Sequence, residues 1–301
     1  MITCDLGSNT LRIAQFDVFT CKRLQTFERI VRTAKNLHQT QRISEEAKAK
    51  IFDALHSASI LFDFKKETSF CVTTEAMRVA KNAPEILESI YQTFGLRFEI
   101  ISGEMEAYYT ALAIEHALKR ENLPSHTYAL FDLGGGSTEI TLCYEQQKQS
   151  HSFPFGIVTT AERFKEHLEE NIATLIHSIR PWVSSFHNVS TTYKQLITTA
   201  GTPTTVAAFL QGLDYEHYEP EKVNGSILHV KEFDDALQQL TNMPLEDAER
   251  YTGTNRRDLV IVGILMVKAI MKELDFKACI VFDDGLREGV AISNCNICVS
   301  S

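Results

Sequence analysis

The strongest chemical signal in the sequence is a glycine-rich loop between two acids, Asp132-Leu-Gly-Gly-Gly-Ser-Thr-Glu139. Three consecutive glycines allow backbone N–H groups to approach a ligand closely, and successive N–H groups in a turn form a concave nest that binds anions. The hydroxyls of Ser137 and Thr138 extend this set of donors, and the two carboxylates suit a Mg²⁺ ion that holds phosphate oxygens. The loop has neither the Gly-Lys-Ser/Thr of a Walker loop nor the spacing of a Rossmann fingerprint. It predicts a phosphate site, with a glycine-rich hairpin and an exposed glutamate as the alternative.

A second loop, Thr199–Thr205, follows a predicted strand and carries similar donors. Thr202 is placed as an N-cap and Pro203 at the first helical position, so a helix is expected to begin there. Because the free N–H groups of a helix N-terminus bind phosphate readily, Gly201, Thr202 and Thr204 are candidate contacts. An ordinary capped helix is the alternative.

Charged side chains stand just after two other predicted strands. Arg78 ends the segment Thr74-Glu-Ala-Met-Arg78, where a guanidinium can clamp phosphate oxygens, although an ordinary surface arginine is the alternative. Glu104 and Glu106 fall in the first turn of a predicted helix, two residues apart and therefore on roughly opposite sides. One of them can face a ligand and act as a general base towards a water. The alternative is that such acids only complement the helix dipole.

The elements that would position these residues follow from the periodicity of apolar residues. Two antiparallel strands are expected on either side of the turn Gly7-Ser8-Asn9, in a loop for which a plain tight turn is also an adequate explanation. Further strands are expected at 24–31, 69–72, 97–101, within 129–142, and at 151–155, 195–198 and 278–282. Helices are expected after the N-cap Ser44 as far as 58, and at 84–94, 104–119, 157–170, 172–186, 203–210 and 256–273.

The opening pattern recurs in the middle of the chain. Ala129–Leu142 has the form of Ile2–Leu11, which is a strand ending in Asp-Leu-Gly, a small polar turn and a second alternating strand. Like elements at half-chain spacing predict two similar α/β halves that face each other. The polar segment Arg120–Ser125 predicts the connection. We therefore expect domains at 1–119 and 120–301, with the last residues packing back on the first domain.

Composition excludes several classes of protein. The chain has 301 residues, of which 44% are hydrophobic, so it can form a packed core. A net charge of −9 argues against nucleic-acid and anionic-membrane binding, because both need a broad positive field. The start has no signal-peptide pattern and the longest apolar run, Leu259–Val267, is too short to span a bilayer, so a cytoplasmic protein is expected. The seven cysteines are expected to be reduced, and the pair Cys295 and Cys298 to have no redox or metal-binding role.

Taken together, the motifs resemble those of the exopolyphosphatase/guanosine pentaphosphate phosphohydrolase (Ppx/GppA) family over essentially the whole chain. The segments that carry the resemblance are Asp5–Thr10, Thr74–Arg78, Ser102–Ala107, Asp132–Glu139 and Ala200–Thr205, followed by Arg256–Asp258 and Asp284–Gly289. The resemblance implies an α/β fold of two actin-like domains, of the sugar kinase/Hsp70 or ribonuclease H-like type. It also implies that these domains face each other across a cleft that holds the site.

The resemblance further implies roles for individual residues. Glu106 matches the catalytic base of the family, and Asp132 and Glu139 match acids near the nucleophilic water and a Mg²⁺ ion or another divalent cation. Asp5 is a third candidate metal ligand. The positions that match phosphate contacts are Ser8, Asn9, Arg78, Gly135, Gly136, Ser137 and Thr138.

The function implied is the release of terminal phosphate from inorganic polyphosphate, from guanosine pentaphosphate, or from both. The binding partner implied is polyphosphate or guanosine penta- or tetraphosphate. Met105 replaces a glutamate that is common in the family motif, and the chain ends soon after Gly289, without the C-terminal helical region of many members. The missing region favours short chains over long polyphosphate. The alternatives are an ATPase or kinase of the same superfold and a sensor without turnover. The oligomeric state is open, and a homodimer is one alternative.

Overall fold

The computed structural model describes residues 1–145, 147–186, 192–199 and 201–295. The chain forms two compact units, one of Met1–Ile114 with the described residues from Gly285 onward, and one of Glu115–Asp284. It therefore passes between the units twice, once within the helix that begins at Gly103 and once after Asp284. The sequence predicts the first crossing after residue 119, whereas this division places it inside the helix.

The first unit is built on a five-stranded sheet in the order β3-β2-β1-β4-β5. The strands are β1 (Ile2–Leu6), β2 (Thr10–Phe16), β3 (Arg23–Ile30), β4 (Ser69–Thr73) and β5 (Phe98–Ile100). The helices are α1 (Leu37–Thr40), α2 (Glu45–Leu61), α3 (Glu75–Val79), α4 (Ala83–Phe94), the first part of α5 (Gly103–Arg120) and α15 (Leu286–Asn294). As the sequence predicts, Ser44 caps α2, because its hydroxyl oxygen accepts a hydrogen bond of 3.2 Å from the backbone N–H of Ala47.

The second unit is built on a six-stranded sheet in the order β10-β11-β9-β6-β7-β8. The strands are β6 (Thr127–Leu133), β7 (Thr138–Tyr144), β8 (Gln147–Phe153), β9 (Leu196–Thr199), β10 (Ser226–His229) and β11 (Ala278–Val281). The longer helices are α6 (Ile157–Arg163), α7 (Leu168–His177), α10 (Gly201–Leu210), α12 (Val230–Asn242), α13 (Leu245–Thr252) and α14 (Arg257–Glu273). The short ones are α8 (Arg180–Val183), a 3₁₀ turn at Ser184–Phe186 and α11 (Pro220–Val223).

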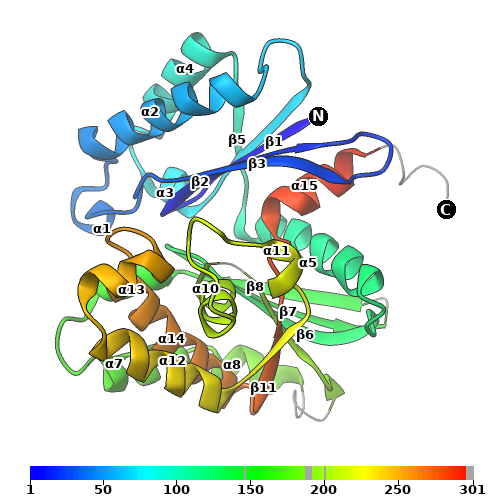
Figure 1. The fold of residues 1–301 in the computed structure, drawn as a ribbon, viewed down its shortest axis with the longest axis vertical. Coiled ribbons are helices and arrows are strands. Elements are labelled where there is room, and N and C mark those ends of the chain that lie inside the picture. The colour runs from blue at the N-terminus through cyan, green and yellow to red at the C-terminus, as the bar shows by residue number, and fades with distance from the viewer. Residues whose placement is uncertain (146, 187–191, 200, 296–301) are drawn as a thin grey trace. The chain divides into compact units, whose positions relative to one another are not determined.

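The two sheets share one topology (Figure 1). In each sheet three consecutive strands form an antiparallel meander, β1-β2-β3 or β6-β7-β8. The first strand of each meander then pairs in parallel with the next strand along the chain, β4 or β9. The repeat predicted from the two Asp-Leu-Gly segments is thus confirmed, as is the α/β class with two units of actin-like topology.

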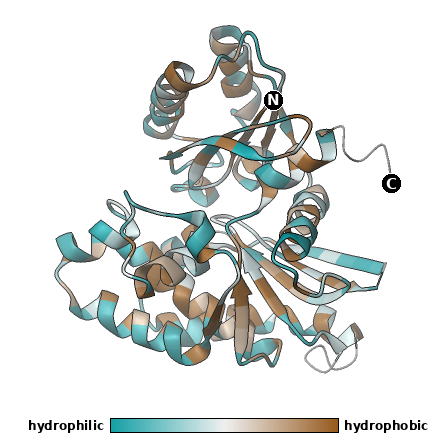
Figure 2. Cartoon of the chain, turned by 45° about the vertical axis from the view of Figure 1, so that its right-hand side comes forward, coloured by the Kyte–Doolittle hydropathy of each residue, from teal (hydrophilic) through white to brown (hydrophobic). Residues whose placement is uncertain are grey.

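The core of the second unit centres on α14, which packs against α6, α7, α10, α12 and α13. Most of its length is buried, and Figure 2 shows that the central strands and inner helix faces are hydrophobic while the outer faces are mainly hydrophilic. Such burial explains the long apolar stretch that the sequence shows before Glu273. Among the helices of the described residues, none is long and apolar enough to cross a membrane.

The structure corrects two of the helices expected in the second unit and adds two others. The helix expected at 157–170 ends at Arg163, and the next begins at Leu168 after His167, whose backbone is left-handed with φ 49°. The helix expected at 172–186 is interrupted before α8, because Pro181 lacks the N–H that a continuous helix would need. The helices α12 and α13 were not anticipated.

The cysteines also depart from the expectation. Cys21, in the turn between β2 and β3, forms a disulfide with Cys295 at the end of α15, so these two thiols are not reduced. They lie far apart in sequence and meet because α15 packs on β1 and β2. The other described cysteines, Cys4, Cys71, Cys143 and Cys279, are free and buried, as expected. Cys298 lies outside the described residues.

Candidate functional site

In the first unit, Arg78 and Glu106 are in direct contact. Arg78 Nη1 donates to Glu106 Oε2 at 3.2 Å and to the carbonyl oxygen of Ile101 at 2.7 Å. The side chains are 19% and 12% exposed, so the pair is partly shielded but reachable from solvent. The structure thus brings together the arginine expected to bind phosphate and the glutamate expected to act as base.

Local chain geometry explains how these two side chains meet. The parallel strands β4 and β5 are neighbours, and each is followed by a helix, α3 or α5. Because the carboxyl ends of parallel strands lie at one edge of a sheet, Arg78 on α3 and Glu106 in the first turn of α5 emerge at the same edge. This is the position where ligands bind in open α/β sheets.

Sequence inspection missed a second acid at this cluster. Glu75 Oε2 accepts a hydrogen bond of 3.0 Å from Arg78 Nε and forms an ion pair with Arg78 Nη2 at 2.9 Å. The i,i+3 spacing on α3 is the signal that could have identified it. Burial would lower the pKa of Arg78, but the carboxylates of Glu106 and Glu75 more than offset burial and hold that pKa above its ordinary value. The guanidinium therefore remains charged.

The loop between β1 and β2 is held by hydrogen bonds from the backbone that follows β3. The carbonyl oxygen of Asn9 accepts from the N–H groups of Val31 and Arg32, and that of Ser8 accepts from Ala34. The side-chain oxygen Asn9 Oδ1 is buried and accepts no hydrogen bond. A buried open acceptor suits a metal-bound water or a protonated phosphate. Asp5 lies beside this loop, directly opposite Arg12 of β2.

In the second unit the glycine-rich loop joins β6 to β7 and is held by α6. The carbonyl oxygen of Gly134 accepts from Ile157 N, and that of Gly135 accepts from Val158 N at 2.9 Å. These bonds tie the loop carbonyls to the start of α6 and leave the loop N–H groups of Gly135 and Gly136 as candidate anion donors. Ser137 is 3% exposed.

Two residues around this loop have structural roles that spacing alone does not reveal. The Thr138 hydroxyl is buried and donates to the carbonyl oxygen of Phe155 at 2.7 Å, so it braces the loop. Gly156 touches the loop so closely that an added Cβ would lie 2.5 Å from the oxygen of Gly134. Only glycine fits there.

The two acids that bracket the loop are neighbours across the sheet. Asp132 on β6 pairs directly with Glu139 on β7, and Glu139 pairs in turn with Ser152 on β8. Directly opposed residues of antiparallel strands project from the same face, so the carboxylates lie side by side. Glu139 is 2% exposed and accepts a hydrogen bond of 2.6 Å from Ser152 Oγ. Ser152 is a further residue that the sequence did not indicate.

Two carboxylates on one face fit a hard divalent cation. Like charges directly opposite each other destabilise a sheet, and Mg²⁺ prefers oxygen ligands, often only one or two carboxylates with water and substrate phosphate completing the shell. Among the described residues there is no group of three or more His, Cys, Asp or Glu that could hold a metal by itself. Asp132 and Glu139 therefore suit a cation shared with a bound phosphate rather than a site closed by the protein.

The third loop leads into α10, which begins at Gly201. Thr202 and Pro203 are therefore the second and third residues of the helix, so the expectations that Thr202 is the N-cap and that Pro203 is the first helical residue are both wrong. Thr202 is 2% exposed and packed against Gly263 of α14. The hydroxyl of Thr204 donates to the carbonyl oxygen of Gly201 at 3.2 Å. Ala200, directly before this turn, lies outside the described residues.

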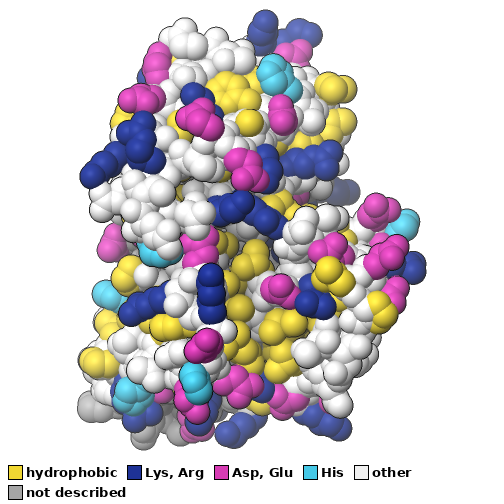
Figure 3. All heavy atoms as spheres, turned by 90° about the vertical axis from the view of Figure 1, so that its left-hand side faces the viewer, with side chains coloured by type: hydrophobic (Ala, Val, Ile, Leu, Met, Phe, Trp, Pro, Cys, Tyr) yellow, Lys and Arg dark blue, Asp and Glu magenta, His cyan; other side chains and the backbone are white. Residues whose placement is uncertain are grey.

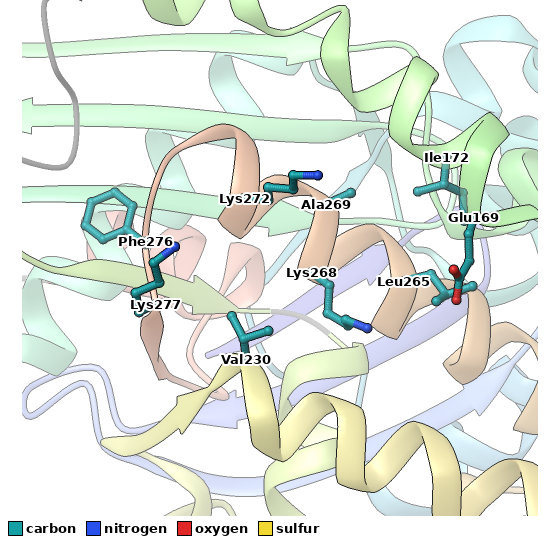
Figure 4. Close-up of a pocket in the computed structure, with 9 residues that line it drawn as sticks. All are labelled: Glu169, Ile172, Val230, Leu265, Lys268, Ala269, Lys272, Phe276 and Lys277. Atoms are coloured by element: carbon teal, nitrogen blue, oxygen red, sulfur yellow. The ribbon is translucent and has the colours of Figure 1, made fainter.

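A separate cavity of about 490 Å³ lies in the second unit among α7, α12 and α14 (Figure 4). Its walls are mainly apolar, with Lys268 and Lys272 one turn apart on α14 and Glu169 on α7. Lys268 is paired with Asp234. None of the residues that line it is among the predicted site residues.

The face shown in Figure 3 carries acidic and basic side chains intermixed, with apolar side chains between them. No broad basic field is visible on that face, which agrees with the net charge of −9. Arg78 is one cation of the candidate site, where it lies beside Glu106.

Both the sequence and the fold are similar to those of known proteins. The sequence matches the Ppx/GppA phosphatase family over residues 13–296. The structure of a Ppx/GppA enzyme from Aquifex aeolicus is 30% identical with a TM-score of 0.75, and the match covers 97% of this chain and 98% of that one. An exopolyphosphatase from Cytophaga hutchinsonii shares the fold, at 22% identity and a TM-score of 0.83, with 97% and 96% of the two chains covered.

A curated relative is considerably longer. A bifunctional 3-dehydroquinate synthase/phosphatase from Fusobacterium nucleatum is 24% identical over 284 residues. The match covers 89% of this chain and 42% of that protein, so the chain spans less than half of its length.

Proposed function

Because the chain belongs to the Ppx/GppA phosphatase family, we propose that it releases terminal phosphate from short inorganic polyphosphate, from guanosine pentaphosphate, or from both. The observation that carries this proposal is the contact between Arg78 and Glu106. It joins a cation that can bind a phosphate oxygen to a carboxylate that can take a proton from water.

The proposed reaction is an in-line attack of water on the terminal phosphorus. Glu106 orients the water and accepts its proton as the bond from the water oxygen to phosphorus forms. The bond from phosphorus to the bridging oxygen breaks, and that oxygen leaves with the electron pair. Arg78 stabilises the negative charge on the phosphoryl oxygens. The N–H groups of the glycine-rich loop, in the second unit, are a separate candidate for binding phosphate groups.

Asp132 and Glu139 are the residues we propose to hold Mg²⁺. When bound, the ion would neutralise phosphate charge and help to orient the substrate. Ser152, which donates to Glu139, would keep one carboxylate oxygen in place. Asp5 is a weaker candidate, since it lies opposite Arg12 rather than another acid.

The preference for short substrates rests on charge. The protein has a net charge of −9, so its surface outside the site repels a long polyanion. A short polyphosphate or a nucleotide needs only the positive charge of the site itself. Long polyphosphate should therefore be a poorer substrate than short polyphosphate.

The test is a phosphate-release assay with three substrates, namely short polyphosphate, long polyphosphate and guanosine pentaphosphate. Each is assayed with Mg²⁺ and with excess EDTA. We expect Mg²⁺-dependent release from a short polyphosphate or from guanosine pentaphosphate. Transfer of phosphate from ATP to an acceptor would favour a kinase, and stable binding of guanosine pentaphosphate without phosphate release would favour a sensor. If either result is obtained and neither polyphosphate nor guanosine pentaphosphate is hydrolysed, the proposal is contradicted.

A further inference from the structure

The guanidinium of Arg78 is held on two edges by different kinds of partner. On one edge, Nε donates to Glu75 Oε2 at 3.0 Å, and Nη2 lies 2.9 Å from the same oxygen in an ion pair. Both residues belong to the short helix α3, so this contact is fixed within one element. It uses the side of the guanidinium that faces back along its own helix.

On the other edge, Nη1 donates to two acceptors from the segment around the start of α5. The carbonyl oxygen of Ile101 lies at 2.7 Å and Glu106 Oε2 at 3.2 Å. The backbone carbonyl cannot leave, whereas the glutamate side chain can rotate. The Glu106 contact is the longest of the four, and it is therefore the one that an incoming anion can replace most easily.

From this asymmetry we infer that Glu75 is a positioning residue that lets Arg78 exchange Glu106 for a phosphate oxygen. The inference rests on the function proposed above. Glu75 holds the Nε edge in both states, so the guanidinium stays in place while the Nη1 edge changes partner. Without ligand, Arg78 pairs with Glu106. With phosphate bound, Arg78 pairs with the phosphate, and Glu106 is released to take a proton from water.

Simple electrostatics makes the opposite prediction for Glu75. A carboxylate near a bound anion repels it, so removing its charge should tighten anion binding. If Glu75 instead positions Arg78, removing the Glu75 carboxylate leaves Glu106 as the remaining carboxylate partner of the guanidinium. The Arg78–Glu106 pair is then stronger than in the wild type, and an incoming anion must compete with it. Removal of Glu75 should then weaken anion binding, whereas removal of Glu106 should strengthen it.

The experiment measures binding of imidodiphosphate, a hydrolysis-resistant diphosphate, by titration calorimetry. We expect Glu75→Gln to raise the dissociation constant about tenfold, which is the scale of one charge-assisted hydrogen bond. Glu106→Gln should lower it several-fold. The matched control is Glu99→Gln, which removes the same charge from an exposed residue of β5 and should change binding little.

A second variant separates position from charge. Glu75→Asp keeps the charge but is one methylene shorter, so it should also weaken binding if position matters, and should bind as the wild type does if only charge matters. Thermal unfolding of each variant verifies that it is folded. Tighter binding by Glu75→Gln, or unchanged binding by Glu75→Asp, would overturn the inference.

The turnover of Glu106→Gln tests the proposed function separately. If that variant keeps wild-type turnover, Glu106 is not the base, although the binding data still report on the exchange of partners. If turnover is lost while Glu75→Gln binds more tightly, the proposed base stands and the positioning role of Glu75 is wrong.

Discussion

At the scale of single residues, the repulsion between the carboxylates of Asp132 and Glu139 bears on the stability of the sheet. The two carboxylates stand directly opposite each other on β6 and β7, and one of them is almost fully buried. Opposed like charges destabilise a sheet unless a cation or a proton compensates them. A cation bound by both acids would turn this cost into a favourable interaction.

The pair therefore predicts a link between Mg²⁺ and stability. Asp132→Asn should melt at a higher temperature than the wild type in EDTA, because the repulsion is gone. Added MgCl₂ should then raise the melting temperature of the wild type but not of the variant, since a ligand stabilises only the state that binds it. Thermal unfolding over a Mg²⁺ titration measures both effects. Asp53→Asn, at an exposed acid of α2, is the control. An equal Mg²⁺ response in Asp132→Asn and the wild type would contradict the assignment.

The sequence identified the two acids of this pair but not Ser152, which donates a hydrogen bond to Glu139. Six residues lie between Asp132 and Glu139, and a strand–turn–strand pattern of that length brings them opposite each other. Ser152 was missed because its role depends on the register of a third strand, which has no signature in the order of residue types. Glu75, beside Arg78, was missed although its i,i+3 spacing is visible in the sequence, because that spacing does not say which way the side chains point.

At the scale of elements, the glycine-rich loop depends on the start of α6. The first N–H groups of α6 bind carbonyl oxygens of Gly134 and Gly135, and Gly156 packs directly on the loop. A helix start that donates to the loop carbonyls fixes the direction of each peptide group, and therefore the direction of the loop N–H groups as well. The shape of the candidate anion nest is thus set by a residue outside it.

Because the loop depends on Gly156, adding a single methyl group at this position should disturb the loop. In Gly156→Ala the new Cβ would lie 2.5 Å from backbone atoms of the loop, which cannot move as a flexible side chain would. We expect a loss of about 1–3 kcal/mol in the free energy of unfolding, the usual cost of overpacking, together with a raised KM for the phosphate substrate. Denaturant unfolding and steady-state kinetics measure these quantities.

The control is Gly212→Ala, where φ is +75° and nothing lies within 4 Å of an added Cβ. It should cost about 1–2 kcal/mol through backbone strain and leave KM unchanged. Wild-type stability and KM in Gly156→Ala would show that the loop does not depend on this contact.

The sequence predicted strands more reliably than helices at this scale. Alternating residues around the Asp-Leu-Gly segments specify β1, β2, β6 and β7, because a period of two is hard to confuse with other patterns. The region 157–186 was harder, since its apolar residues continue across two breaks. One break is made by Pro181 and the other by a left-handed His167, a conformation that residue type alone does not require.

At the scale of the whole molecule, the Cys21–Cys295 disulfide joins the two ends of the chain. The bonded residues are 274 positions apart, and the bond ties α15 to the turn after β2. The sequence could not indicate this pairing, because seven cysteines at irregular spacing allow many connectivities. The partner of Cys295 follows only from the packing of α15 on β1 and β2.

The disulfide predicts a difference in stability between oxidised and reduced protein. Cross-linking residues this far apart restricts the unfolded chain strongly, and such bonds typically contribute about 2–4 kcal/mol. Dithiothreitol should lower the melting temperature of the wild type and leave that of Cys21→Ser unchanged. Peptide mapping without reduction should recover the Cys21–Cys295 link. If the link is present and its reduction leaves the melting temperature unchanged, the bond does not stabilise the fold.

The central claim is that the chain hydrolyses a terminal phosphate with Glu106 as the general base. The most direct test compares phosphate release by the wild type, by Glu106→Gln and by the control Glu99→Gln, with Mg²⁺ and the best substrate of the panel. Removal of a positioned base typically lowers the rate about 10²- to 10⁴-fold. We therefore predict a loss of that size in Glu106→Gln, with a normal melting temperature, and wild-type turnover in Glu99→Gln. Wild-type turnover in Glu106→Gln would contradict the account.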